Sequence, residues 1–307
     1  MKKTGLIIII VICFVVFIAC STAGVLLTIR TIGWSNLTDQ TAWQNQIGTW
    51  LQDNPIWDHV NNLGNQLSID ETRDLDLEGI NTVEITAVSE QVRLLTAGDR
   101  AYAQLKGSYH SFSQSIAWIT EKQDGILKIH TRYPRFGLLS GDLAFIVQIP
   151  ASYTGNVRVN AVSGSCVLPD DMACQWNTFR FSGVSGELTL ARADMDNLNF
   201  SSVSGNIVIN KADCKINGQT TSSEININYN VFQACKLNTI SGDINLDLPQ
   251  NTNCELEYTT ISGDFTQNGL TFSDTKDNKR KVSGTLGQGG TSLDVSTTSG
   301  NLSMSGH

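Results

Sequence analysis

The sequence has little charge, little proline and few aromatic residues. Charged residues make up 16% of its 307 positions, aromatic residues make up 7%, and there are 5 prolines. The formal net charge is −8, so the chain lacks the basic face that nucleic-acid binding needs, and we expect no nucleic-acid partner. Glycine is abundant by contrast, with 26 residues. Together with many Ser, Thr and Asn residues, it is typical of turn-rich β proteins rather than helical enzymes.

The sequence also lacks the common motifs of catalysis and cofactor binding. It has no Cys-x-x-Cys pair for zinc, no phosphate-binding or dinucleotide-binding glycine loop, and no Gly-x-Ser-x-Gly nucleophile motif. The pairs Asp170-Asp171 and Asp194/Asp196 could supply the two carboxylates of a polysaccharide-active enzyme. Aspartates in loops are usually only solvated, however. We therefore predict no enzyme activity, no catalytic residue, no cofactor and no bound metal.

The N-terminus holds one long apolar segment. The run over residues 6–29 is uncharged, and as a helix rising about 1.5 Å per residue it would reach roughly 36 Å, enough to cross a hydrocarbon core of about 30 Å. Lys2 and Lys3 precede the run and Arg30 ends it, so positive charge is concentrated on the N-terminal side. We predict a single-pass transmembrane anchor over residues 1–30 at the cell membrane, with a cytoplasmic N-terminus and an extracytoplasmic remainder.

Two other fates of this segment stay open. The stretch FIACS resembles a lipoprotein processing box, in which Cys20 would be lipidated. The segment could also be a cleaved signal peptide, although the apolar core of a signal peptide is shorter, about 7–15 residues. The apolar run continues past Cys20, which favours the uncleaved anchor.

Residues 31–70 are polar but rich in tryptophan. Trp43, Trp50 and Trp57 are seven residues apart, which is a helical spacing, and Pro55 would kink or break such a helix. We predict a short helical juxtamembrane stalk over residues 31–70. Its tryptophans would either lie at the membrane surface or pack against the domain or a second copy.

The remaining residues, 71–307, predict one β domain. Short alternating runs such as TVEITAV and LAFIVQIP indicate strands before Pro150, with turns at residues 97–99 and 123–125. From about residue 155, a unit of two strands and a Ser-Gly turn repeats with a period close to twenty. The turn glycines are Gly164, Gly186, Gly205, Gly242, Gly263, Gly284 and Gly300, and Ser223 occupies the turn of one degenerate copy.

A unit of this length is too short to bury a core alone. When each unit stacks on the next at about 4.8 Å, the backbone groups pair and the inward side chains form one continuous core. The sequence therefore predicts an all-β fold, a β-solenoid with a period of about 20 residues, preceded by the transmembrane helix and the stalk. In one copy, Ile244 and Leu246 would point inward and Asp243 and Asn245 outward, while Gly242 would adopt a positive φ.

Four cysteines open the same half of the repeat. Each of them precedes an apolar residue by two positions, which places the thiols in the core. They are Cys174, Cys214, Cys235 and Cys254. A disulfide among Cys214, Cys235 and Cys254 of neighbouring coils, or a bound metal, is the alternative, although the fifth cysteine, Cys166, makes the number odd.

The position after the turn glycine is acidic or Asn in most copies. Carboxylate and backbone oxygens stacked between coils could hold calcium. Asp and Asn also suit turns and form polar ladders, and we expect the ladder. The residues are Glu187, Asn206, Glu224, Asp243, Asp264 and Asn301.

The repeats resemble a known bacterial family. The stretches IPASYTGNVRVNAVSG and LDLPQNTNCELEYTTISGD, with the recurring Ser-Gly-Asp or Ser-Gly-Asn turn, are similar to a family of bacterial surface proteins regarded as adhesins, over about residues 75–307. The resemblance implies a β-helix domain of unknown function, commonly tethered by one N-terminal transmembrane helix. Some members accompany regulators of cell-envelope stress, and the family has no established catalytic residue.

The anchor and the resemblance together predict a function. We expect a non-catalytic, membrane-anchored extracytoplasmic module that binds like an adhesin through the faces of its solenoid, with a cell-wall glycan or an envelope protein as partner. One alternative is an accessory of a cell-envelope stress-response system that acts through the anchor or the stalk. The other is a polysaccharide-active β-helix enzyme.

Overall fold

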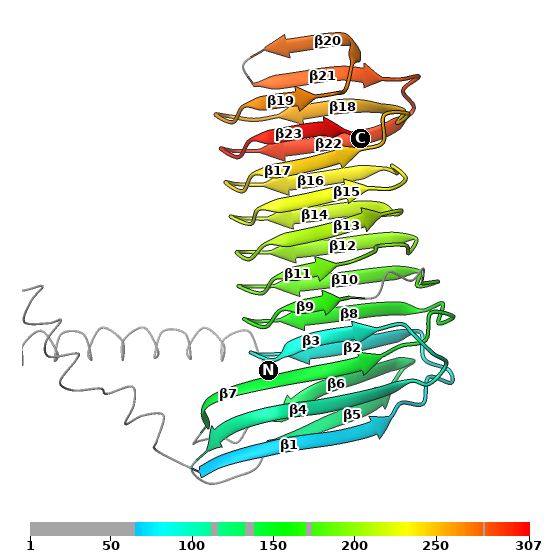
Figure 1. Cartoon of the computed structure of the whole chain (residues 1–307), viewed down its shortest axis with the longest axis vertical. Helices are drawn as coiled ribbons and strands as arrows, with labels where there is room; N and C mark the ends of the chain where they lie inside the picture. Colours follow the sequence, from blue (N-terminus) through cyan, green and yellow to red (C-terminus); the bar gives the residue numbers. More distant parts are fainter. Residues whose placement is uncertain (1–64, 112–115, 133–137, 170–173, 279) are drawn as a thin grey trace, which may run out of the picture. The chain divides into compact units, whose positions relative to one another are not determined.

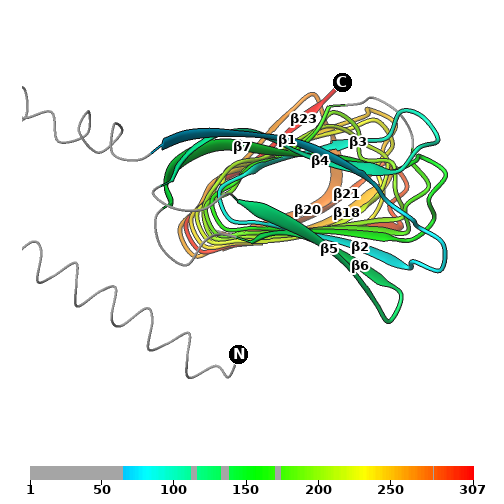
Figure 2. The ribbon, with the colours of Figure 1, turned by 90° about the horizontal axis from the view of Figure 1, so that it is seen from below.

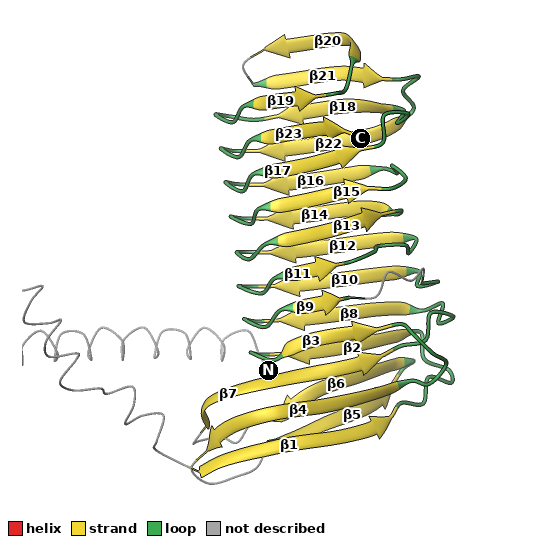
Figure 3. Cartoon of the chain, in the orientation of Figure 1, coloured by secondary structure: helices red, strands yellow, loops and turns green. Residues whose placement is uncertain are grey.

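The computed structural model describes residues 65–111, 116–132, 138–169, 174–278 and 280–307 (Figure 1). Figure 3 shows that these residues form strands joined by turns and loops. The predicted anchor over residues 1–30 and most of the predicted stalk lie outside them. Within this part of the chain, no helix is long and apolar enough to cross a membrane.

The first strand corrects the expected end of the stalk. β1 spans Asn65–Asp74 and pairs antiparallel with β4, so residues 65–70 are a strand and not the end of a helix. Leu67 and Ile69 pack against the core, while Ser68 is exposed. This period of two follows from the pairing with β4, which overrides the helix predicted up to residue 70.

Two large sheets with mainly parallel pairing form the described domain. Sheet A has eleven strands. In order across the sheet they are β1 (Asn65–Asp74), β4 (Tyr102–Ser111), β7 (Leu138–Gln148), β3 (Gln91–Leu95), β9 (Cys166–Leu168), β11 (Leu188–Leu190), β13 (Ile207–Ala212), β15 (Ile225–Tyr229), β17 (Ile244–Leu248), β23 (Leu302–Gly306) and β19 (Phe265–Asn268).

Sheet B has twelve strands and faces sheet A across the core. In order across the sheet they are β20 (Phe272–Asn278), β21 (Lys281–Leu286), β18 (Cys254–Thr259), β22 (Thr291–Thr297), β16 (Cys235–Thr239), β14 (Lys215–Thr220), β12 (Asn197–Ser202), β10 (Thr178–Gly183), β8 (Asn156–Ala161), β2 (Thr82–Ala87), β6 (Ile126–Arg132) and β5 (Ala117–Gln123).

The core lies between the two sheets, which Figure 2 shows as facing layers in a view along the stack. In β17, Ile244 and Leu246 are buried and alternate with Asn245, which is partly exposed, and Asp243 before the strand is exposed. The predicted direction of these four side chains is confirmed. One turn of the chain through both sheets is a coil, and stacked coils form the predicted all-β, solenoid-like fold.

A tight corner leads from a strand of sheet B to the next strand of sheet A and recurs about every twenty residues. The Ser204 backbone N–H donates to the Val184 carbonyl of the preceding coil at 2.8 Å. The Ser222 N–H donates to the Val203 carbonyl in the same way at 2.9 Å. The degenerate copy over residues 221–223 is therefore a corner, as predicted.

Close approach between corners, rather than positive φ, explains most of the turn glycines. Gly205 has a φ of 116°, but Gly164, Gly186 and Gly242 do not have positive φ. A Cβ atom at Gly186 would overlap the Gly164 carbonyl oxygen, and one at Gly242 would overlap the Ser223 carbonyl oxygen. Glycine is needed because successive corners touch backbone to backbone. The predicted positive φ is wrong for Gly242.

Gly284 is not a turn glycine. It lies inside β21, opposite Leu256 of β18 in an antiparallel pairing. The KVSG sequence matches the repeat, but Phe272 of β20 packs over the Gly284 backbone. Glycine serves here to admit a neighbouring ring, so the predicted corner at Gly284 is wrong.

The coils leave sequence order at the C-terminal end of the domain. β22 lies between β16 and β18 in sheet B, and β23 lies between β17 and β19 in sheet A (Figure 1). The chain therefore skips one position after β17, forms β18 to β21, and returns to fill the gap. The prediction that each coil stacks on the next holds from β8 to β17 and fails beyond β17.

The N-terminal end departs from sequence order in a similar way. β2 and β3 form a coil that pairs with β8 and β9 on one side and with β6 and β7 on the other. The corner of this coil reads AVSE, so Glu90 occupies the position of the turn glycine. Because the Ser-Gly signature is missing here, the repeat pattern does not reveal this coil.

Glu90 is fully buried at this first corner. Its carboxylate accepts hydrogen bonds from the backbone N–H groups of Val88 at 2.7 Å and Ser89 at 3.0 Å, and from the Thr131 hydroxyl. At the next corner, the N–H of Val162 bonds to a backbone carbonyl of the first coil. The Glu90 side chain thus supplies the acceptors that a neighbouring corner supplies elsewhere.

A side-chain cluster joins the outermost strands of the two sheets at the N-terminal end. The Arg73 guanidinium of β1 lies 4.3 Å from the Trp118 ring centroid of β5 and donates to the Trp118 carbonyl at 2.9 Å. The Trp118 indole N–H donates to Glu71 at 3.1 Å. Because β1 and β5 are the edge strands of sheets A and B, this cluster covers the end of the core.

Candidate functional site

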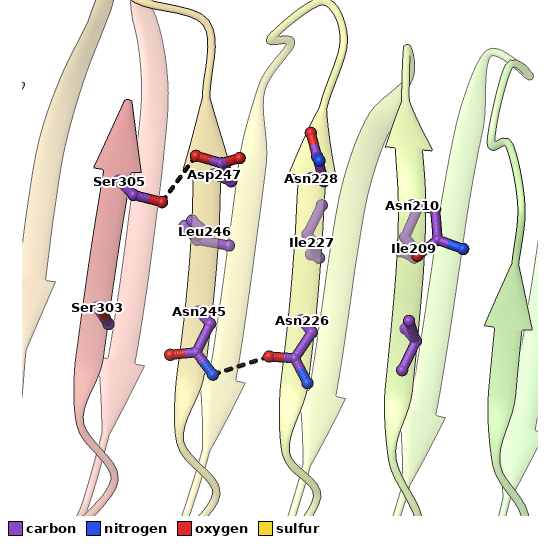
Figure 4. Close-up of a pocket in the computed structure, with 11 residues that line it drawn as sticks. Ile209, Asn210, Asn226, Ile227, Asn228, Asn245, Leu246, Asp247, Ser303 and Ser305 are labelled. Atoms are coloured by element: carbon purple, nitrogen blue, oxygen red, sulfur yellow. Dashed lines mark hydrogen bonds between the residues drawn. The ribbon is translucent and has the colours of Figure 1, made fainter. Parts of the chain in front are cut away.

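The outer face of sheet A carries a polar hollow of about 200 Å³ across β13, β15, β17 and β23 (Figure 4). Its outward side chains are Val208, Asn210, Asn226, Asn228, Asn245, Asp247, Ser303 and Ser305. They fall into rows because the strands pair in parallel and in register, with Asn226 beside Asn245 and Asn245 beside Ser303. In such a ladder, every second residue faces outward.

Hydrogen bonds along these rows fix the side chains. Asn245 Nδ2 donates to Asn226 Oδ1 at 2.8 Å (Figure 4). Asn226 Nδ2 in turn donates to Glu224 Oε1 at 3.1 Å. In the second row, the Ser305 hydroxyl donates to Asp247 Oδ1 at 2.7 Å. A primary amide has two donors and two acceptor sites, so each Asn keeps capacity for a ligand while its orientation is held.

The residues after the turn glycines form a polar ladder. Asp243 Oδ1 accepts the Asn301 backbone N–H at 2.9 Å, and Asn301 Oδ1 accepts the Asp264 backbone N–H at 2.9 Å. The Asp243 carbonyl accepts the Ile225 N–H at 2.9 Å, so backbone oxygens of this column are also in use. The predicted ladder is confirmed. Among the described residues, no three His, Cys, Asp or Glu side chains are placed to hold a metal ion.

The outer face of sheet B carries a different trough. Arg158, Arg180, Asn199 and Asn217 form one row across β8, β10, β12 and β14. Two hollows of about 250 and 190 Å³ lie along the row and share Arg180 and Asn199. Arg158 lies 3.9 Å from Glu84. Within the described residues, the side chains of Arg180, Asn199 and Asn217 make no hydrogen bond or ion pair.

The two candidate carboxylates Asp194 and Asp196 border a hollow of about 550 Å³ at the corner between β11 and β12. The Arg192 guanidinium bridges Asp194 at 2.9 Å and Asp213 at 3.0 Å. Such a bridge ties adjacent coils together and occupies a carboxylate that catalysis would need. Asp170 and Asp171 lie outside the described residues, and the lack of enzyme activity stays a prediction.

The cysteines are core residues, as predicted. Those of the described domain are Cys166, Cys174, Cys214, Cys235 and Cys254, and all are buried and free. Their shared place in the repeat predicts that the thiols stack in one column, and this is wrong, because Cys235 pairs in register with Ile216, which lies two positions beyond Cys214. β22 also separates the coil of Cys254 from that of Cys235. The alternative of a disulfide between these two assumes that coils adjacent in the sequence are adjacent in the stack, which is not the case here.

Burial suppresses the reactivity of these thiols. It raises the pKa of Cys214 and Cys235 to about 12 and that of Cys174 and Cys254 to about 11. The Tyr229 hydroxyl lies beside the Cys235 thiol, and burial raises its pKa as well. Because the thiolate is the nucleophile and the metal ligand, protonated thiols of this kind serve packing rather than chemistry.

Sequence reasoning missed the rows that cross the coils. Arg158 and Arg180 are separated by the same interval as the turn glycines Gly164 and Gly186 that follow them, so the repeat could have shown that they are neighbours. A further row runs along the corners, where an exposed Val or Ile precedes the serine of most turns. Its members are Val88, Val162, Val184, Val203, Ile240 and Ile261. β-branched side chains suit these extended, hydrogen-bonded corners.

The family model for Toastrack DUF4097 matches residues 136–305, which is more than half of the chain. No curated protein matches the sequence. Solved structures that are similar over most of their length include the following three. A "putative cell adhesion protein" from Clostridium sporogenes ATCC 15579 is 9% identical, with 78% of this chain and 100% of that chain covered and a TM-score of 0.35.

The other two structures come from Parabacteroides distasonis ATCC 8503. A "putative adhesin" is 11% identical, with 80% of this chain and 98% of that chain covered and a TM-score of 0.39. A "putative lipid binding protein" is 15% identical, with 78% and 97% covered and a TM-score of 0.33. At such identities and scores, these likenesses assign no ligand to this chain.

Proposed function

Because the chain belongs to the Toastrack DUF4097 family, we propose that it is a non-catalytic, membrane-anchored binding module on the outside of the cell. Its ligand is a cell-wall glycan that lies along the outer face of sheet A. The observation that carries this proposal is the hydrogen-bonded pair of Asn226 and Asn245 in the hollow of Figure 4, which Glu224 holds from beside the hollow.

The chemistry of this row fits the hydroxyl groups of a glycan. Hydroxyls both donate and accept hydrogen bonds, and so do primary amides. Asn245 presents an amide and Asp247 a carboxylate, which accepts hydrogen bonds, on one strand, and the next coil repeats polar groups at about 4.8 Å. Because the strands are rigid and the side chains are already bonded to each other, little conformational entropy remains to be lost on binding.

The location rests on the N-terminal sequence. The uncharged run over residues 6–29 is long enough to span a bilayer, and Lys2 and Lys3 favour a cytoplasmic N-terminus. The domain that follows would then lie outside the membrane, where cell-wall glycans are found. The orientation is tested by labelling intact cells with an antibody against an epitope at His307. We expect the epitope to be accessible from outside.

The binding proposal is tested with the full chain in mild detergent, by co-sedimentation with isolated cell-wall glycan. Replacing both Asn226 and Asn245 with alanine should weaken binding by about tenfold or more, because at least one hydrogen bond of roughly 1.4 kcal/mol is lost. The matched control is Asn238→Ala. It removes an amide from the outer face of sheet B that lines neither the sheet A hollow nor the sheet B trough. It should bind as the wild type does.

Two outcomes would overturn the proposal. One is a wild-type chain that does not sediment with any cell-wall glycan. The other is equal binding by the double variant and by Asn238→Ala. If binding is instead lost only when residues 1–64 are replaced by an unrelated anchor, the accessory role in the envelope stress response replaces it.

A further inference from the structure

We infer that the trough on the outer face of sheet B is a separate binding site for the acidic groups of a polysaccharide. The site is centred on Arg158 and Arg180 and extends over Asn199 and Asn217. It lies on the opposite face of the core from the sheet A hollow, uses arginines that this hollow lacks, and is independent of the proposed function.

The first observation is a pair of like charges in direct register. Arg158 of β8 and Arg180 of β10 are partners in a parallel pairing, so their side chains leave the same face about 4.8 Å apart. Like charges placed side by side on a sheet destabilise it. The repulsion between the two arginines lowers stability, whereas the rest of the repeat favours the fold. Such an exception points to a function for the pair.

The second observation is that the described domain supplies no partner for the charge of Arg180. Arg158 has one loose partner, Glu84, at 3.9 Å, and Arg180 has no partner among the described residues. The chain as a whole has 29 acidic and 21 basic residues, so carboxylates to pair with a second arginine are plentiful in the sequence. The free guanidinium instead borders both hollows.

The third observation is the set of neutral donors along the same row. The Asn199 and Asn217 side chains follow Arg180 on the next two strands and make no hydrogen bond within the described residues. This differs from sheet A, where Asn226 and Asn245 bond to each other. A guanidinium binds a carboxylate or sulfate through two parallel N–H groups, and free amides beside it suit the hydroxyls of the same sugar chain.

The lining favours an acidic polysaccharide over a nucleic acid. Single-stranded nucleic acids are held by aromatic side chains on which the bases stack. The aromatic residue that borders this trough, Phe200, is buried in the core and offers no exposed ring face.

The test measures binding of the full chain to alginate, which carries carboxylates, to dextran sulfate, and to uncharged dextran. We expect binding to one or both acidic polymers that weakens as salt is raised, and none to dextran. Arg180→Gln should weaken binding by about tenfold, and Arg180→Lys should recover only part of it because lysine cannot form the bidentate contact. Arg93→Gln, which removes an exposed arginine from sheet A, should change binding less than about twofold.

A thermal melt separates binding from folding. Arg180→Gln relieves the repulsion with Arg158, so its Tm should equal or exceed that of the wild type while its affinity falls. Three results would overturn the inference: equal losses of affinity for Arg180→Gln and Arg93→Gln, binding of dextran as tight as that of the acidic polymers, or tighter binding of a single-stranded DNA homopolymer than of either acidic polysaccharide.

Discussion

The middle of the domain and its two ends differ in how the order of the strands in space follows the order in the sequence. From β8 to β17, each coil lies on the coil that precedes it in the sequence, and glycine corners touch backbone to backbone. At the ends, the chain leaves this order, and antiparallel strands such as β4 and β5 or β20 and β21 cover the last coils. The middle is thus specified by a local repeat, and the ends are specified by long-range pairing.

This difference has an energetic meaning. In the middle, a coil depends on its two neighbours, so its stability is nearly a sum of local terms. At the C-terminal end, β18 and β19 depend on β22 and β23, which come later in the sequence. Closing such distant contacts costs chain entropy before the contacts are made, so the ends are the slower part to form.

Removal of residues 291–307 should have the largest effect. It deletes β22 and β23, whose buried side chains include Leu293, Val295, Leu302 and Met304. Burying four such side chains contributes on the order of 10 kcal/mol. We expect β18 to β21 to lose their protection from amide hydrogen exchange, while β8 to β15 keep theirs.

A deletion from the middle is the matched control. Removing residues 203–220 takes out one coil and joins Ser202 to Thr221 at the corner, because Ser202 and Thr220 occupy the same register position. A shorter but cooperative stack should result, with a single unfolding transition. If this deletion disrupts the domain as much as the C-terminal one, the middle depends on long-range pairing as strongly as the ends do.

Gly242→Ala should have the next largest effect. A methyl group there would overlap the Ser223 carbonyl oxygen, so two corners must separate, at a cost of roughly 3 kcal/mol or more. Gly79→Ala provides the comparison at the N-terminal end. Gly79 has a φ of 70° but no atom within 4 Å of the added methyl group, so only backbone strain of about 1 kcal/mol is expected. Urea unfolding of both variants measures the difference, and equal costs would refute the role of corner contact.

Glu90→Gly restores the repeat consensus at the first corner and should nevertheless destabilise the domain. The backbone N–H groups of Val88 and Ser89 lose their acceptor, and the Thr131 hydroxyl loses a partner. A cost of about 1–3 kcal/mol is expected in chemical denaturation. Glu90→Gln retains one acceptor oxygen and should cost less. A stabilised Glu90→Gly variant would show that the first corner is an ordinary corner.

Thiol labelling should reveal the smallest difference between the regions. At pH 8, the raised pKa values of Cys254, about 11, and Cys214, about 12, leave almost no thiolate in the folded protein. Labelling then requires local opening, which is easier near the end of the stack. Peptide mapping by mass spectrometry should show Cys254 reacting several-fold faster than Cys214. The same rate at both sites would mean that the domain opens only as a whole.

The sequence determines the middle of the fold far better than the ends. Alternation places Ile244 and Leu246 inward without any knowledge of neighbours, and the period of twenty locates the corners. The same pattern misassigns Gly284 and hides the coil of Glu90, because there the environment of the residue comes from distant strands. No local sequence pattern predicts that β22 lies between β16 and β18. Its position depends on which strands of the sheet still have an unpaired edge.

The candidate sites follow the same division. The outward direction of Asn245 could be predicted from its strand, but its hydrogen bond with Asn226, 19 positions away, needs the register of two coils. The pairing of Arg158 with Arg180 could be predicted from the sequence, because the two residues are one repeat interval apart. Charged residues that contact one another in a β repeat therefore occupy equivalent positions of successive repeats rather than neighbouring positions in the chain.

The position of β22 and β23 also limits how the chain can be synthesised and how it can evolve. The stack cannot close until residues 291–306 have left the ribosome, because the place they fill lies between coils made earlier. A coil duplicated within β8 to β17 simply lengthens the stack. A coil added directly after β23 would find both sides of β23 occupied, by β17 and β19, so relatives of this protein should differ in length by whole periods gained or lost in the middle.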